Sequence, residues 1–274
     1  MIWLIRAIHG CINFILTPLN GLSYAWGIVL CSAFTGIVML LIFRATSNQA
    51  QIKRVKDIIK AYILEIRLYK DSPRIIMSAF GHILVKNLVY LRYAFVPLLI
   101  VIIPVSLILM QLHFRYEYRG FRPHEAVLVK AFLKAEAAQD IHLVSLTASD
   151  GLEVETPPLH IEKYNEVDWR IRVRKQGVHF LTVHGRDMDV VKSLNAVERL
   201  LPLSPKRVSP VWSAVLFNPG EQPLPPQSPF SSVEIVYPQR VNILLGVQLN
   251  WLVAFFILSL IFALVLKGPM KVEV

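Results

Sequence analysis

The chain has 274 residues, of which 54% are hydrophobic and 18% charged, and its formal net charge is +10. With a mean hydropathy of +0.50 it is too apolar for an ordinary soluble domain and too charged for burial wholly in lipid. The basic excess is local, because residues 44–92 carry ten basic and three acidic residues, whereas residues 113–244 carry sixteen and fifteen. We therefore expect a membrane protein with one polar domain, and no specific nucleic acid as a partner.

Residues 1–20 are apolar but carry one polar helical face, on which Arg6, His9, Asn13 and Thr17 recur at spacings of three and four. This pattern predicts an amphipathic helix that lies in the membrane interface. The segment does not fit a signal peptide, because an arginine lies in the middle of its apolar region and no small-residue cleavage site is present. Whether the segment lies on the membrane or crosses it as a fourth span stays open.

Three segments are apolar and long enough to cross a bilayer, namely residues 22–44, 94–112 and 243–267. Lysine and arginine accumulate in cytoplasmic loops, so the basic segment 45–93 is assigned to the cytoplasm. The N-terminus is then outside, the tail 268–274 is cytoplasmic, and residues 113–242 form an extracytoplasmic domain. The expected location is the bilayer of a bacterial inner membrane.

The basic segment 45–93 is predicted to form a cytoplasmic helical hairpin. Its first half has a coiled-coil seam with spacings of three and four: Ile52, Val55, Ile59, Tyr62, Ile66 and Tyr69. Ser72 and Pro73 suit the cap and first position of a new helix. This second helix presents apolar residues at helical spacing: Met77, Phe80, Leu84, Leu88 and Leu91.

The extracytoplasmic segment reads as all-β and sandwich-like. Short strands are predicted at residues 126–133, 141–147, 167–174 and 178–183, where β-branched and alternating residues are separated by turn signals. Residues 202–238 contain nine prolines and are expected to form an extended strap, with a final edge strand at residues 232–237.

No catalytic motif is present in the sequence: it has no phosphate-binding loop, nucleophile elbow or HExxH motif. The two cysteines, Cys11 and Cys31, lie in apolar segments, and the eight histidines are scattered. We therefore expect no enzyme, no catalytic residues, no cofactor and no metal.

Four polar residues in or beside the spans are candidates for a substrate groove: Arg44, Ser32, Thr35 and Gln111. An arginine facing a wet groove could receive polar parts of a substrate. The alternative is that Arg44 snorkels to the interface while the small residues pack helices together. Both interpretations stay open.

The order of parts up to Leu112 resembles the YidC/Oxa/Alb insertase superfamily: an amphipathic helix, Ala25-Trp26-Gly27 at the entry of a span, Arg44 at its inner end, Asn48-Gln49-Ala50-Gln51-Ile52-Lys53-Arg54-Val55-Lys56 opening a hairpin, and a second span. The resemblance implies an insertase-like or chaperone-like protein that assists the insertion or assembly of other membrane proteins. Its partners would be nascent membrane proteins or the ribosome.

By the same resemblance Arg44 would be the groove cation, and the hairpin would recruit substrates through Gln49, Gln51, Lys53, Arg54, Lys56 and Lys60. A different hypothesis is a structural or receptor-like subunit of an envelope complex that binds other membrane subunits through its external β-domain.

Overall fold

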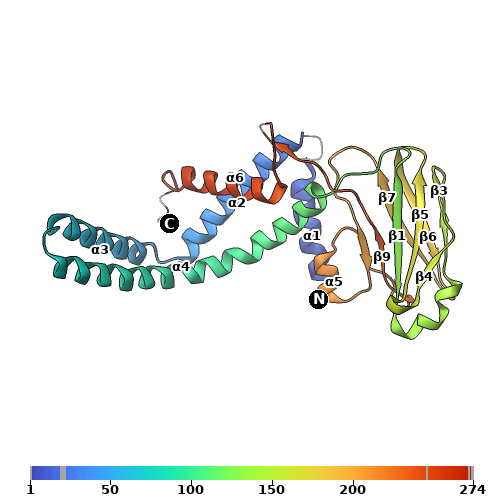
Figure 1. Cartoon of the computed structure of the whole chain (residues 1–274), viewed down its shortest axis with the longest axis horizontal. Helices are drawn as coiled ribbons and strands as arrows, with labels where there is room; N and C mark the ends of the chain where they lie inside the picture. The colour runs from blue at the N-terminus through green and yellow to red at the C-terminus, as the bar shows by residue number, and fades with distance from the viewer. Residues whose placement is uncertain (1, 19–22, 245, 271, 273–274) are drawn as a thin grey trace. The chain divides into compact units, whose positions relative to one another are not determined.

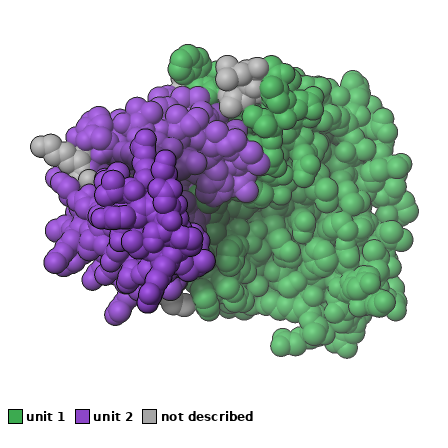
Figure 2. Space-filling model, turned by 60° about the vertical axis from the view of Figure 1, so that its left-hand side comes forward, with its two compact units in different colours: residues 1–27, 109–251 green, residues 28–108, 252–274 purple. Residues whose placement is uncertain are grey.

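The computed structural model describes residues 2–18, 23–244, 246–270 and 272. The chain divides into two compact units, one of residues 1–27 and 109–251 and the other of residues 28–108 and 252–274 (Figure 2). The first unit contains all the described strands, and the second contains most of the helical residues (Figure 1). The predicted combination of long apolar helices with a β-sheet domain is therefore present.

The helices of the described part are α1 (Ile2–Leu16), α2 (Tyr24–Thr46), α3 (Gln49–Leu68), α4 (Pro73–Tyr116), α5 (Trp212–Phe217) and α6 (Trp251–Leu266), with 3₁₀ helices η2 (Ala135–Leu143) and η3 (Glu162–Tyr164). Two of them, α2 with 23 residues and α4 with 44, are long and apolar enough to cross a membrane. The ends of the predicted segments at residues 19–22, 271 and 273–274 lie outside the described residues.

In the second unit α3 folds back along the first half of α4 (Figure 1). The Asn48 side chain caps α3 by accepting a hydrogen bond from the Gln51 amide, and α4 begins at Pro73 as predicted. The ring of Tyr62 stacks on that of His82, with centroids 5.0 Å apart. The two helices thus pack together as the seam predicts.

Two predicted helical boundaries differ from the structure. The second arm of the hairpin and the second apolar segment form one helix, α4, because no capping sequence separates them; Pro97 and Pro104 lie inside it. The third apolar segment is helical only from Trp251, since residues 243–244 pair with residues 247–248 as a short hairpin, in which Gly246 has a φ of +82° that suits glycine. The resulting α6 has 16 residues and is about 24 Å long.

The strands are β1 (Ala126–Leu133), β2 (Ser145–Ala148), β3 (Leu152–Val154), β4 (Leu159–Ile161), β5 (Glu166–Val173), β6 (Gly177–His184), β7 (Asp189–Ala196), β8 (Lys206–Val208), β9 (Phe230–Ile235), β10 (Ile243–Leu244) and β11 (Val247–Gln248). One antiparallel sheet has the order β3-β5-β1-β9-β8, with β4 also paired to β5, and a second has the order β2-β6-β7. β10 and β11 form the separate hairpin.

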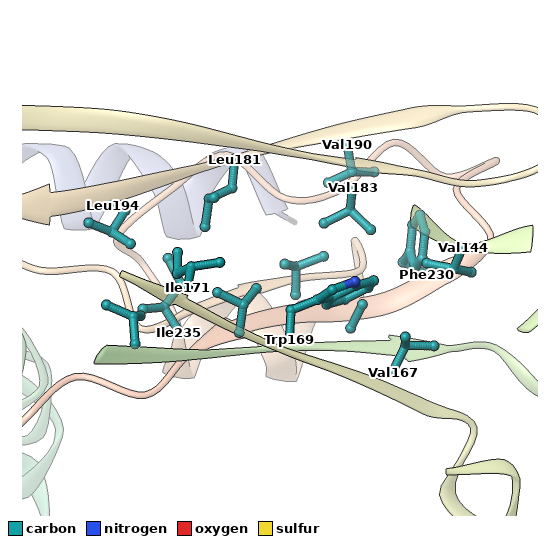
Figure 3. Packing of buried hydrophobic residues seen from close by; sticks show 14 of the residues in the cluster. Val144, Val167, Trp169, Ile171, Leu181, Val183, Val190, Leu194, Phe230 and Ile235 are labelled. Carbon is teal, nitrogen blue, oxygen red and sulfur yellow. The ribbon is translucent and has the colours of Figure 1, made fainter. Parts of the chain in front are cut away.

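One hydrophobic core lies between these two sheets (Figure 3). Trp169 and Ile171 of β5 meet Leu181 and Val183 of β6, and all four side chains are almost completely buried. Alternate residues of each strand point into this core because successive side chains of a strand lie on opposite faces.

Three details of the predicted β-domain are wrong. Residues 135–143 form η2, which carries Ile141 into the core, so the strand predicted at 141–147 is limited to β2. The predicted final edge strand is β9, which instead lies between β1 and β8. The Pro-rich segment is also more than an extended strap, because it contains β8, α5 and β9.

Candidate functional site

A cavity of about 250 Å³ lies within the first unit. Its walls come from α1, from the last turns of α4 and from the segment 202–222: Arg6, His9, Gly10, Asn13, Gln111, Phe114, Pro202, Val215, Pro219, Gly220, Glu221 and Gln222. Polar groups from three distant parts of the chain therefore converge on one concave site, which is the usual form of a binding site.

The helix α1 turns its polar face toward this cavity. His9 is 4% exposed, whereas the apolar residues on the other face are largely uncovered, with Trp3 79% and Phe14 80% exposed. This is the reverse of a helix that packs its apolar face on a soluble core. It is the arrangement expected of a helix whose apolar face meets lipid.

Two side-chain hydrogen bonds connect α1 to the end of α4. The Nε2 atom of Gln111 lies 2.8 Å from Nδ1 of His9, and Arg115 donates to Oδ1 of Asn13 at 2.5 Å. Gln111 and Arg115 are both almost fully buried. These contacts fix the polar face of α1 as one wall of the cavity.

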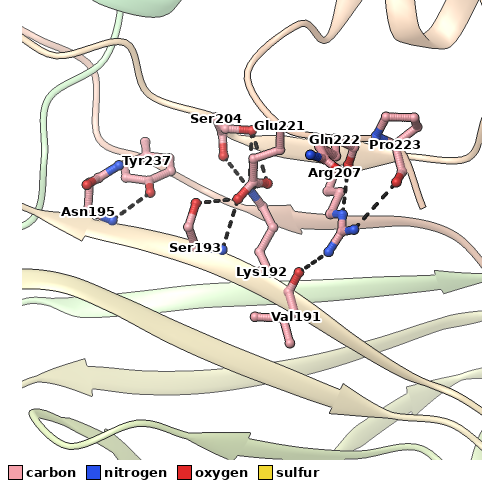
Figure 4. Close-up of polar contacts among 10 residues, drawn as sticks. All are labelled: Val191, Lys192, Ser193, Asn195, Ser204, Arg207, Glu221, Gln222, Pro223 and Tyr237. Carbon is pink, nitrogen blue, oxygen red and sulfur yellow. Dashed lines mark hydrogen bonds and ion pairs between the residues drawn. The ribbon is translucent and has the colours of Figure 1, made fainter. Parts of the chain in front are cut away.

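The opposite wall is fixed by a buried ion pair (Figure 4). The fully buried Lys192 of β7 lies 2.5 Å from Oε2 of Glu221 and donates to the Ser204 carbonyl at 2.5 Å. The other Glu221 oxygen accepts from the amide and the hydroxyl of Ser193. Arg207 adds hydrogen bonds to the carbonyls of Gln222 and Val191.

Lys192 and Ser204 are also close enough to raise the question of a nucleophilic serine, with Nζ and Oγ 3.3 Å apart. A lysine that acts as a general base must be neutral. Burial lowers the pKa of Lys192 and Glu221 opposes this shift, while Glu221 and the two Ser204 oxygens accept hydrogen bonds from all the donors of its ammonium group. The cluster therefore fits a structural clamp for segment 202–222.

His9 is the least exposed of the titratable residues that line the cavity, at 4%. Burial lowers its pKa, and the Leu216 carbonyl opposes this shift. The neutral imidazole is thus favoured at neutral pH. Its Nε2 atom is buried and meets no hydrogen-bond partner among the residues described.

The structure gives the four predicted groove residues different surroundings. Ser32 and Thr35 are fully buried on α2, and their hydroxyls have no hydrogen-bond partner among the described residues. Arg44 lies twelve residues beyond Ser32, which is about 18 Å along the helix, and donates to the Met270 carbonyl at 3.1 Å. Gln111 belongs to the first unit, where it contacts His9.

The predicted hairpin residues open α3, and they differ in exposure. Lys53, Arg54 and Lys60 are exposed, while Gln49, Gln51 and Lys56 are half-buried. Lys56 lies over the ring of Tyr90 on α4, with Nζ 5.9 Å from the centroid. Half of the predicted set therefore lies on the exposed surface of α3.

The second arm of the hairpin leaves its apolar stripe uncovered. The residues predicted to share a face of α4 are all at least half exposed, from 53% for Phe80 and Leu84 to 72% for Met77. The stripe continues along the same face, at spacings of three and four, into the more apolar half of the helix. Its members, called here the α4 stripe, are Met77, Phe80, Leu84, Leu88, Leu91, Phe95, Leu98 and Ile102.

Sequence reasoning missed the cavity. The polar face of α1 was visible in its spacing, but Glu221 and Lys192 are separated from it by about two hundred residues and gave no signal. Comparisons with protein-family models, with curated proteins and with solved structures found no match to this chain.

Proposed function

We propose that the chain is an integral membrane protein of the insertase-like or chaperone-like kind, which assists the insertion or assembly of other membrane proteins without catalysing a reaction. The observation that carries this proposal is the α4 stripe. Large contiguous apolar surfaces on a soluble element mark sites of protein or membrane interaction. The stripe starts in the hairpin half of α4 and continues into its more apolar half. It therefore offers a path along which an apolar client segment can move.

The dimensions of the stripe fit such a client. From Met77 to Ile102 it covers 25 helical steps, or about 38 Å. A membrane-spanning helix of about 20 residues is about 30 Å long. One client helix could therefore remain in contact with α4 from the hairpin to the bilayer, so that its apolar residues never face water.

The first residues of α2 and α6 and the last residue of α4 are aromatic and contact one another within the first unit. Tyr24 of α2 contacts Tyr116 of α4 with ring centroids 5.5 Å apart, and Tyr116 stacks on Trp251 of α6 at 6.4 Å. Because Tyr116 and Trp251 are almost completely buried, these contacts hold the three helix ends together. These contacts agree with an orientation in which α2 enters, α4 leaves and α6 enters the bilayer at one surface, with residues 113–242 outside and the hairpin in the cytoplasm of a bacterial cell.

Polar side chains within the helices supply a second, smaller argument. The hydroxyls of Ser32, Thr35 and Ser259 are buried without a hydrogen-bond partner among the residues described. These hydroxyls reach a client only when the helices separate, and each could then satisfy a polar atom of a segment that passes through lipid, which lowers the cost of its desolvation. Met39 lies on the Ser32–Thr35 face of α2 and is half-buried, whereas Ile37 is exposed on another face.

Site-specific photo-crosslinking in cells tests the proposal. Probes at Leu84, Leu88 and Met39 should capture newly made membrane proteins, and matched probes at Ile63 on α3, as exposed as Leu84, and Ile37 on α2 should capture far fewer. Equal yields at both sets of positions, or capture of lipid alone, would overturn the proposal. Depletion of the protein should lower the amounts of several small membrane proteins together.

The second candidate function is that of a subunit that binds a partner through its external domain. It is favoured by apolar residues on the outer face of the β2-β6-β7 sheet, where Val178, Phe180 and Val191 are 53%, 52% and 46% exposed. A stable, stoichiometric partner that is lost in the variant Phe180→Ser, without loss of the Leu88 crosslinks, would establish this role beside the first.

A further inference from the structure

The cavity of the first unit contains an acid whose hydrogen-bonding capacity is already used. The two oxygens of Glu221 accept from Lys192, from Ser193 and, at 3.2 Å, from the Ser204 hydroxyl. Lys192 also neutralises its charge. Glu221 therefore leaves little negative charge and few free lone pairs for a ligand.

His9, by contrast, presents an unused donor. An amide nitrogen can only donate, so the contact from Gln111 Nε2 makes His9 Nδ1 the acceptor and leaves the hydrogen on Nε2. That Nε2–H is buried and forms no well-aligned hydrogen bond within the described part of the chain, although the Leu216 carbonyl lies near enough to oppose the lowering of the His9 pKa. A buried donor of this kind costs free energy until an acceptor reaches it.

Asn13 and Arg6 add donors to the same wall. Because Oδ1 of Asn13 accepts from Arg115, its amide NH₂ remains to donate. Arg6 lines the cavity and is exposed, and it forms no ion pair with another described residue. The nearby charges are thus Arg6 and Arg115 on one side and the self-neutralised Lys192–Glu221 pair on the other, a net positive balance.

We propose that this cavity binds a phosphate group, held by the Arg6 guanidinium, the His9 Nε2–H and the Asn13 amide. A phosphate offers several acceptor oxygens and a negative charge, which matches three convergent donors around a cationic wall. The cavity of about 250 Å³ has room for more than an inorganic phosphate. A phosphate ester fits better.

The source of the phosphate ester is either a soluble metabolite or a lipid headgroup. The outward face of α1 is apolar and exposed, which would bring headgroups close to the cavity if that face enters lipid. Both sources share the same recognition chemistry, and separate arms of one experiment distinguish them.

The full chain in detergent is the material for the test. One arm measures calorimetric binding of inorganic phosphate and glycerol 3-phosphate. The other measures, by native mass spectrometry, retention of phosphatidylglycerol against diacylglycerol, which lacks the phosphate. The variants are Arg6→Gln and Gly10→Leu. Gly10 lines the cavity, and a Cβ added there meets no atom within 4 Å, so its leucine should fill the cavity without disturbing the fold.

Arg186→Gln is the matched control, since it removes the same charge from an exposed arginine that does not line the cavity. We expect Arg6→Gln to weaken binding about tenfold or more, Gly10→Leu to abolish it, and the control to bind as the wild type does. Binding of glycerol 3-phosphate with this pattern assigns a soluble ester, and selective retention of phosphatidylglycerol assigns a headgroup. No binding in either arm, or binding that Gly10→Leu leaves unchanged, would overturn the proposal.

Discussion

The buried pair between Lys192 and Glu221 gives the sharpest test of how the β-domain is held together. In the variant Lys192→Met the side chain keeps a similar length, but Glu221 loses its cation and the Ser204 carbonyl loses its donor. Removing one partner of a buried pair costs about 3–5 kcal/mol, because the other charge stays buried. For a unit of this size the expected fall in Tm is about 6–20 °C.

Thermal unfolding of the full chain in detergent, followed by near-UV circular dichroism, measures this loss. The control is Arg122→Met, which breaks the ion pair between Arg122 and Glu198. These two side chains are 61% and 59% exposed. An exposed pair of this kind is worth less than about 1 kcal/mol. The double variant Lys192→Met with Glu221→Leu should lose less than the sum of the two single variants, because it leaves no charge behind.

Acid should act on the same pair. Burial raises the pKa of Glu221, but Lys192 and Ser193 outweigh it and hold that pKa below its ordinary value of 4.5. A carboxyl group with a depressed folded pKa stabilises the protein above its unfolded pKa, and the stabilisation disappears as the pH falls through the folded pKa. The Tm difference between wild type and Glu221→Gln should thus be constant from pH 7 to 5 and shrink below 4.5.

A Tm change under 2 °C for Lys192→Met, or strict additivity in the double variant, would refute the reasoning.

Three further variants test the packing of both units. Gly36→Leu should destabilise the helical unit by about 1–3 kcal/mol, because a Cβ there meets the Ser259 carbonyl at 3.2 Å and the Phe262 Cβ at 3.3 Å. The control Gly81→Leu should leave the stability unchanged, because a Cβ at Gly81 meets nothing within 4 Å. Ile52→Ala should cost about 2–5 kcal/mol in thermal unfolding, since Ile52 is fully buried in the hairpin, whereas the exposed Ile63→Ala should cost under 1 kcal/mol. The Asn195 amide donates to the buried Tyr237 hydroxyl at 3.0 Å. Tyr237→Phe should therefore lower the stability by about 1–3 kcal/mol and speed hydrogen exchange at the Asn195 amide. Unchanged exchange would contradict that role.

Local periodicity predicted much of the fold. The β-branched, apolar run at residues 126–133 corresponds to β1 and the strict alternation at residues 167–174 to β5, and α4 begins at Pro73 as predicted. Short or irregular elements were missed. β7 has a lysine at a core-facing position, which breaks the alternation, and only the contact with Glu221 explains how Lys192 is buried there.

The sequence by itself determined which segments are apolar, which are amphipathic and where the basic residues gather, because these properties follow from side-chain chemistry and from helix or strand periods. The tertiary structure alone decided what each face meets. It places the polar face of α1 against a cavity and leaves the apolar faces of α1 and of the α4 stripe uncovered. The physical reason is that spacing defines a face but not its partner, since the partner comes from residues a hundred or more positions away.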